Sequence, residues 1–107
     1  SGVQFFAFEW NNATPLDLVT IPAEMYVLSC ELVITEAFNG VSPTLKIGSV
    51  ADDDEIMAAT DNDPAVEAAF SVNPQVVYGS DTLIRLKIAP GAGATQGSGV
   101  ITLLVQS

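Results

Sequence analysis

The sequence of 107 residues contains no histidine, one cysteine and only three cationic side chains, Lys46, Arg85 and Lys87. Without histidine no Ser-His-Asp or Cys-His catalytic arrangement can form, and nearly all zinc sites are excluded. A single cysteine excludes an internal disulfide. Because three cations cannot neutralise several phosphates, we expect neither nucleic acid nor a membrane surface as a partner. These absences predict a protein with no enzymatic activity and no cofactor.

Charged residues are also scarce, at 15% of the chain, but 13 Asp and Glu face only 3 Lys and Arg, so the formal net charge is −10. Hydrophobic residues make up 49%, which favours a folded chain over a disordered one. No apolar run approaches the roughly 18 residues of a membrane span, and no secretory signal pattern is present. We expect one domain over residues 1–107, in which Ser1-Gly2 resembles the remnant of a removed tag.

Several segments alternate apolar and polar residues, and clusters of Pro, Gly, Asn and Asp separate them, which is typical of strands joined by turns. The candidate strands are Val3–Trp10, Leu16–Ile21, Tyr26–Ile34, Leu45–Val50, Glu55–Thr60, Gln75–Tyr78, Thr82–Ala89 and Gly99–Gln106. About eight strands predict an all-β fold, a two-sheet antiparallel β-sandwich of jelly-roll type. Residues 58–70 fit either a strand or one or two helical turns, because Asn62-Asp63-Pro64 interrupts their helix-favouring composition.

Two candidate strands have the strongest alternation. In the first, one apolar face is predicted to hold Tyr26, Leu28, Cys30, Leu32 and Ile34. In the second, Ile84, Leu86 and Ile88 are predicted to face inward, opposite Leu83, Arg85 and Lys87. Because no histidine is available to activate it, the cysteine is expected to be an ordinary buried thiol.

Four aromatic residues gather in the first candidate strand: Phe5, Phe6, Phe8 and Trp10. Phe6, Phe8 and Trp10 fall on one face of this strand, and Val3, Phe5 and Ala7 fall on the other. A strand that is apolar on both faces is expected to lie in the core or against another subunit. An alternative is a sugar-stacking platform, which would require Trp10, Tyr26 or Tyr78 to be exposed beside polar loop residues.

The carboxylates concentrate between residues 52 and 67, where 7 of the 13 occur. A solvated acidic loop is the favoured interpretation. The alternative is a weak Ca²⁺ site formed by Asp52, Asp54, Asp61 and Asp63, although the spacing of an EF-hand is absent. A carboxylate pair for glycoside hydrolysis is a remote third interpretation, since the acids lie in turns rather than at matched positions of facing strands.

The motifs that follow one another from residue 21 onward are Ile21-Pro22-Ala23, a long alternating strand, Thr35-Glu36-Ala37-Phe38-Asn39-Gly40, Pro43-Thr44-Leu45-Lys46-Ile47-Gly48 and an acidic loop. This order resembles the small β-sandwich proteins in the virions of tailed bacteriophages, of the head-decoration, head-fibre or tail-associated type. The resemblance covers about Thr20 to Gln106 and ends in strands like Leu83–Ile88 and Val100–Val105. One departure is Glu24, where the turn in this family tends to hold glycine.

The turn residues of these motifs have a simple physical interpretation. Asn39-Gly40 tolerates positive φ and is predicted to close a tight turn. Pro22 begins a strand, where its missing N–H does least harm. Gly48 is predicted to allow a bulge or a close backbone contact.

The resemblance implies a non-enzymatic virion structural protein that self-associates, with a homotrimer as the preferred oligomer, and attaches to the capsid or tail surface. Its expected location is the virion, after synthesis in the host cytoplasm. Phe5, Phe6, Phe8 and Trp10 are the candidate interface residues. The alternative function is a carbohydrate- or receptor-binding β-sandwich of an adsorption device, because the same fold serves both roles.

Overall fold

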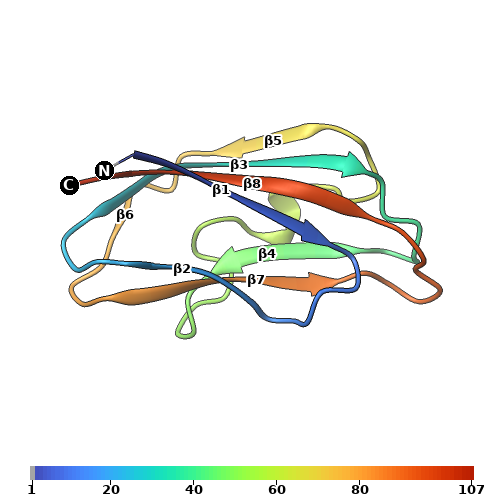
Figure 1. The fold of residues 1–107 in the computed structure, drawn as a ribbon, viewed down its shortest axis with the longest axis horizontal. Coiled ribbons are helices and arrows are strands. Elements are labelled where there is room, and N and C mark those ends of the chain that lie inside the picture. The colour runs from blue at the N-terminus through green and yellow to red at the C-terminus, as the bar shows by residue number, and fades with distance from the viewer. Residues whose placement is uncertain (1) are drawn as a thin grey trace.

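The computed structural model describes residues 2–107, so the first residue of the suggested tag remnant lies outside the described part. Eight strands and one short 3-10 helix make up the fold (Figure 1). In chain order they are β1 (Gly2–Glu9), β2 (Leu16–Ile21), β3 (Tyr26–Glu36), β4 (Thr44–Gly48), η1 (Ala59–Asp61), β5 (Ala69–Val72), β6 (Val76–Val77), β7 (Thr82–Ala89) and β8 (Ser98–Gln106). Within residues 2–107, no helix is long and apolar enough to cross a membrane.

The strands form two antiparallel sheets that face each other (Figure 1). The larger sheet has the order β1-β8-β3-β5, with β6 also paired to β3, and the smaller has the order β2-β7-β4. The first strand therefore pairs with the last, the second with the seventh, and the third with the sixth. This nested pairing is the jelly-roll arrangement. The predicted all-β, two-sheet antiparallel sandwich is confirmed.

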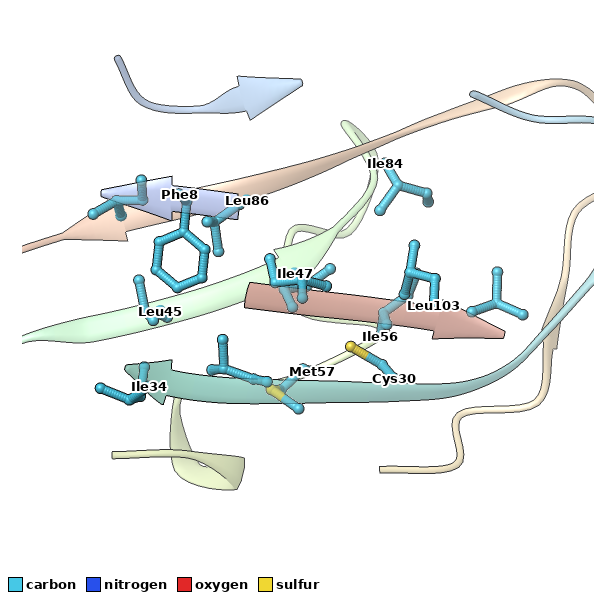
Figure 2. Packing of buried hydrophobic residues seen from close by; sticks show 14 of the residues in the cluster. Phe8, Cys30, Ile34, Leu45, Ile47, Ile56, Met57, Ile84, Leu86 and Leu103 are labelled. Atoms are coloured by element: carbon cyan, nitrogen blue, oxygen red, sulfur yellow. The ribbon is translucent and has the colours of Figure 1, made fainter. Parts of the chain in front are cut away.

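The hydrophobic core lies between the two sheets, and Figure 2 shows its packing. Strands of both sheets contribute fully buried side chains, among them Leu32 and Leu103 from the larger sheet and Leu45 and Leu86 from the smaller. Burying each such side chain stabilises the fold by about 1.5–3 kcal/mol relative to leaving it exposed. The strand β7 follows its predicted alternation, since Ile84, Leu86 and Ile88 are all buried.

The strand β3 departs from the predicted face at its start. Val27 pairs with Val105, and the next pair is Ser29 with Leu104, so Leu28 is an extra residue that forms a bulge. The bulge reverses the alternation: Val27 is buried, whereas Tyr26 is 45% exposed. The prediction that Tyr26 and Leu28 share the buried face with Cys30 is therefore wrong.

The prediction of a strand over Glu55–Thr60 is also wrong. This segment is irregular and leads into the helix η1. Ile56 and Met57 are nonetheless buried, and Met57 forms an isolated bridge with Ile47 of β4. Asn62 adds a hydrogen bond from Nδ2 to the carbonyl of Leu45, at 3.0 Å. The irregular segment thus covers the free edge of β4, which protects it from pairing with another chain. The next strand, β5, was not predicted from the alternation of apolar and polar residues.

The prediction that positive φ closes a tight turn at Asn39-Gly40 is wrong, because neither residue has a positive φ. Gly40 is absent from the positive-φ residues among those described, and a Cβ at this position would lie 2.8 Å from the carbonyl oxygen of Gly91. The glycine therefore permits a close backbone approach, which only a residue without a side chain allows. Glu24, the departure from the phage pattern, has φ of 70°, a conformation that favours glycine.

Cys30 is fully buried on β3, and its thiol is expected to react only when the protein unfolds. Burial, with a smaller contribution from the charge of Glu31, raises its pKa from 9.0 to about 12. Labelling with a thiol reagent should be about three orders of magnitude or more slower in native than in unfolded protein. Because the unfolded thiol ionises first, stability should fall as the pH rises from 9 towards 12. Fast labelling of the native protein at neutral pH would contradict this burial.

Candidate interaction surfaces

The structure separates the four aromatic residues of the first strand onto two faces. Phe8 is only 2% exposed and packs against Phe38, with ring centroids 6.4 Å apart. Phe6 and Trp10 are partly buried against the same core. Phe5 points the other way and is 69% exposed. Only Phe5 of the four therefore has a side chain that is largely free to contact another molecule.

The outward face of the larger sheet gathers most of the exposed hydrophobic side chains. Five of the eight exposed large hydrophobic residues of the described chain lie there, and we call them the apolar patch: Val3, Phe5, Tyr26, Val77 and Leu104. The register places Val3 opposite Leu104 and Tyr26 opposite Val77. Soluble monomers rarely expose large contiguous apolar areas, so these residues form a candidate interaction surface.

The strand that carries Phe5 is also an edge of its sheet. β1 pairs only with β8, so the backbone groups along its other side are not used within the sheet. Edge strands are usually blunted by lysine, proline, bulges or short length. β1 has eight residues, contains neither lysine nor proline, and has a single charged residue, Glu9, at its end. This edge has none of those protective features.

All three cations lie on the opposite side of the molecule, on the outer face of the smaller sheet. Lys46 and Lys87 are directly opposed on β4 and β7, an arrangement that destabilises a sheet when uncompensated. Asp53 compensates it, because its Oδ2 accepts a hydrogen bond from Lys87 Nζ at 2.8 Å and lies 3.9 Å from Lys46 Nζ. The third cation, Arg85, faces Asp17 across β7 and β2.

Replacing Asp53 with asparagine should lower the melting temperature at neutral pH, because two opposed lysines lose their counter-charge. The hydrogen bond from Lys87, and the charges of both lysines, hold the pKa of Asp53 below 3.8. Its stabilising effect is therefore present above pH 3.8 and lost as the pH falls through the lowered pKa. Thermal denaturation of both proteins across this pH range tests the expectation.

Asp54→Asn is the matched control for this experiment. A hydrogen bond with Asp52 and the neighbouring negative charges raise the pKa of Asp54, so its ionised form is unfavourable in the folded protein. Removing that charge should raise the melting temperature at neutral pH. A lower melting temperature for both variants would show that loop distortion, and not charge pairing, dominates.

The four carboxylates of the suggested Ca²⁺ site are used in different ways. Ligand oxygens of Asp52, Asp53 and Asp54 lie within 4.8 Å of one another. Asp61 accepts a hydrogen bond from the backbone of Ala58, and Asp63 accepts one from Ala65. The structure thus brings Asp52 and Asp54 together, with Asp53 bound to lysine, and gives Asp61 and Asp63 local backbone partners.

A cavity of about 370 Å³ adjoins the acidic loop and contains Tyr78. The Tyr78 hydroxyl donates a 2.6 Å hydrogen bond to Glu55. Burial and the Glu55 carboxylate raise the Tyr78 pKa above its ordinary range. Ser49, Asp81 and Thr82 line the same cavity. Of the three aromatic residues considered for sugar stacking, two lie beside polar residues in a hollow: Tyr78, which is partly buried, and the exposed Tyr26, whose hollow also contains Gln75 and Gln106.

Comparison with solved structures finds the same fold in bacteriophage capsids. A chain of the cyanophage Pam1 capsid asymmetric unit matches with a TM-score of 0.75 and 16% identity, covering 97% of this chain and 82% of that one. A chain of the acidic stable capsid structure of Helicobacter pylori bacteriophage KHP30 matches with a TM-score of 0.73 and 15% identity, covering 100% and 89%. No protein-family model and no curated protein matches the sequence. At these identities the likeness establishes a shared fold.

Proposed function

We propose that this chain is a non-enzymatic structural protein of a bacteriophage virion, attached to the capsid or tail surface as a decoration or fibre component. The observation that carries the proposal is the match of nearly the whole chain to chains of two phage capsid structures. The motifs around Pro22, Asn39 and Gly48 independently resemble virion proteins of tailed phages. A sequence without histidine supports a role that depends on surface complementarity and not on catalysis.

In this proposed function the protein binds other virion proteins and further copies of itself. The expected assembly is a homotrimer. Closed symmetric oligomers are the common outcome when one protein binds itself. The net charge of −10 would keep the free protein soluble before assembly. In this role its location is the virion, after synthesis in the host cytoplasm, and nucleic acid is not a partner.

Quantitative mass spectrometry of purified virions, scaled to the major capsid protein, tests this function. A copy number comparable to that of the capsid protein supports a decoration role, and a few copies per particle support a fibre. Absence of the protein from particles that contain the full set of capsid proteins would overturn the proposal. Binding of the purified protein to particles that lack it, followed by sedimentation, provides a second test.

The alternative function is recognition of a host carbohydrate or receptor, and the cavity around Tyr78 is the observation that favours it. An aromatic ring beside Glu55, Asp81 and Ser49 offers one stacking surface and several hydrogen-bonding groups. Tyr78→Ala should abolish binding to host glycans if this function is correct, whereas Phe5→Ser should leave it unchanged. Glycan arrays that show no binding by the wild-type protein would exclude it.

A further inference from the structure

We propose that the outer face of the larger sheet binds a basic protein surface, in which a lysine or arginine of the partner pairs with Glu31 while apolar side chains cover Phe5. This inference rests on the proposed function and deepens it, because it states the chemistry of the virion protein to which the chain attaches. Copies of this chain would then associate through another surface. Of the four candidate interface residues, Phe5 makes the contact, whereas Phe6, Phe8 and Trp10 pack against the core.

The first argument is that a partner covering the apolar patch also covers a carboxylate. The register places Phe5 of β1 opposite Thr102 of β8, and Thr102 opposite Glu31 of β3, so all three project from the same face. Neighbouring strands lie about 4.8 Å apart, which puts Phe5 and Glu31 about 10 Å apart across the sheet. A standard protein interface, at about 800 Å² per partner, is wider than this. A partner that covers Phe5, which is 69% exposed, therefore covers Glu31 as well.

The second argument concerns the cost of covering this carboxylate. Removing a carboxylate from water is strongly unfavourable unless a cation or hydrogen-bond donors replace the water. Both ion pairs within residues 2–107 involve Asp53, so Glu31 has no cation from its own chain. Two further carboxylates lie on this face, Glu9 and Glu36, on either side of Ser98, and no lysine or arginine lies on it. A basic partner supplies the charge that the face lacks.

A second copy of this chain, placed face to face, does not supply that charge. Its three cations lie on the outer face of the smaller sheet, and Asp53 already pairs with two of them. Two larger sheets in contact would oppose carboxylates with carboxylates, and the net charge of −10 on each copy adds repulsion. The same net charge attracts a basic partner and speeds its encounter with the chain. The charge distribution therefore selects a partner of different chemistry.

The carboxylate-rich loop of residues 52–67 also attracts cations, but it is the weaker candidate for a protein interface. Several of its carboxylates are used within the chain: Asp53 pairs with lysines, Glu55 accepts a hydrogen bond from Tyr78, and Asp61 accepts one from Ala58. Five of the eight exposed large hydrophobic residues lie instead on the larger sheet. Protein interfaces typically combine an apolar centre with polar groups around it. The outer face of the larger sheet offers both.

A hollow at one end of this face has room for a second cationic side chain. Its volume is about 420 Å³, and its lining includes Ala7, Glu9 and Val100. Ala7 and Val100 are directly opposed on β1 and β8. The methylene groups of a lysine or arginine can lie along these apolar side chains while the charged group reaches Glu9. The face therefore fits a partner with two basic side chains, one for Glu31 and one for this hollow.

Backbone amide spectra of the isotopically labelled chain, titrated with a short soluble peptide of alternating lysine and leucine, test the inference. Shift changes should concentrate at Phe5, Thr102 and Glu31, and added salt should weaken binding by screening the charges. Phe5→Ser and Glu31→Gln should each raise the dissociation constant at least about fivefold. Val50→Ser and Asp52→Asn are the matched controls, because Val50 is also 69% exposed and both residues lie outside the larger sheet. They should leave the dissociation constant unchanged.

Four results would overturn the inference. The first two are no binding of the lysine–leucine peptide and shift changes confined to residues 52–67. The others are a folded Glu31→Gln variant that binds as tightly as wild type, and equally tight binding of a peptide of alternating glutamate and leucine.

Virion particles that lack the chain separate the inference from the proposed function. If wild type and Glu31→Gln sediment equally with such particles, the chain attaches through another surface and the inference fails. If the protein is absent from virions but the peptide results hold, only the proposed function fails.

Discussion

Leu103→Ala should lower the free energy of unfolding by about 2–5 kcal/mol, the usual range for a leucine removed from a packed core. Leu103 is fully buried on β8, the strand that pairs with both β1 and β3. The register places Cys30 beside it on β3 and Gln4 beside it on β1. Because Leu103 belongs to the packed core, the cavity left by its removal can close only in part. Urea denaturation, with an unchanged m-value, measures the loss.

Leu104→Ala is the control for this prediction, because it makes the same chemical change at the next residue of the same strand. Leu104 points outward and is 36% exposed, so the free energy of unfolding of the isolated chain should change by less than about 1 kcal/mol. Both variants are best measured at a concentration where the chain is monomeric. Equal losses for the two variants would show that the inward and outward faces of β8 are wrongly assigned.

The alternation of apolar and polar residues predicted a strand correctly where the strand is regular, so that each residue's position decides which face it lies on. In β7, every second residue from Ile84 to Ile88 is buried, and two of the three cations of the chain point outward between them. Antiparallel pairing on both sides keeps this strand regular, since β2 and β4 both bind it. For such strands the local pattern is sufficient, which is why the fold class could be predicted from the sequence.

Local patterns fail where a distant partner sets the geometry. The bulge at Leu28 arises from the pairing of β3 with β8, which is more than 70 residues away in the sequence. The irregular segment containing Met57 is shaped by the edge of β4, although its residues resemble a strand or helix. In both places tertiary contacts decide between conformations that the local sequence leaves nearly equal in energy.

The candidate interaction surface could be predicted only in part for the same reason. Phe5 was identifiable from the alternation in the first strand, as was its separation from Phe8 on the opposite face. Leu104 and Tyr26 could not be assigned to the same surface, because that requires the order β1-β8-β3 and the bulge in β3. Strand order is a property of the whole chain, and many two-sheet topologies produce the same alternation.

Gly48→Ala should destabilise the protein by about 1–3 kcal/mol, because the backbone folds back over this residue at the end of β4. An added Cβ would lie 2.5 Å from the carbonyl carbon of Asp53, and backbone atoms cannot move aside as a flexible side chain can. The turn is further held by a 2.9 Å hydrogen bond from the Ser49 N–H to the Asp52 carbonyl. A bulge or a close backbone contact was predicted for Gly48, and the structure shows the close backbone contact.

The displaced loop is the one that carries Asp53 to Lys46 and Lys87, so Gly48→Ala should also weaken that pairing. Consequently, adding Asp53→Asn to Gly48→Ala should lower the melting temperature less than Asp53→Asn does alone. Gly79→Ala is the matched control, because a Cβ there meets no atom within 4 Å and φ is not positive. By restricting the unfolded chain, it should stabilise the protein by about 0.4–1 kcal/mol. Equal effects of the two alanines in chemical denaturation would contradict the close contact at Gly48.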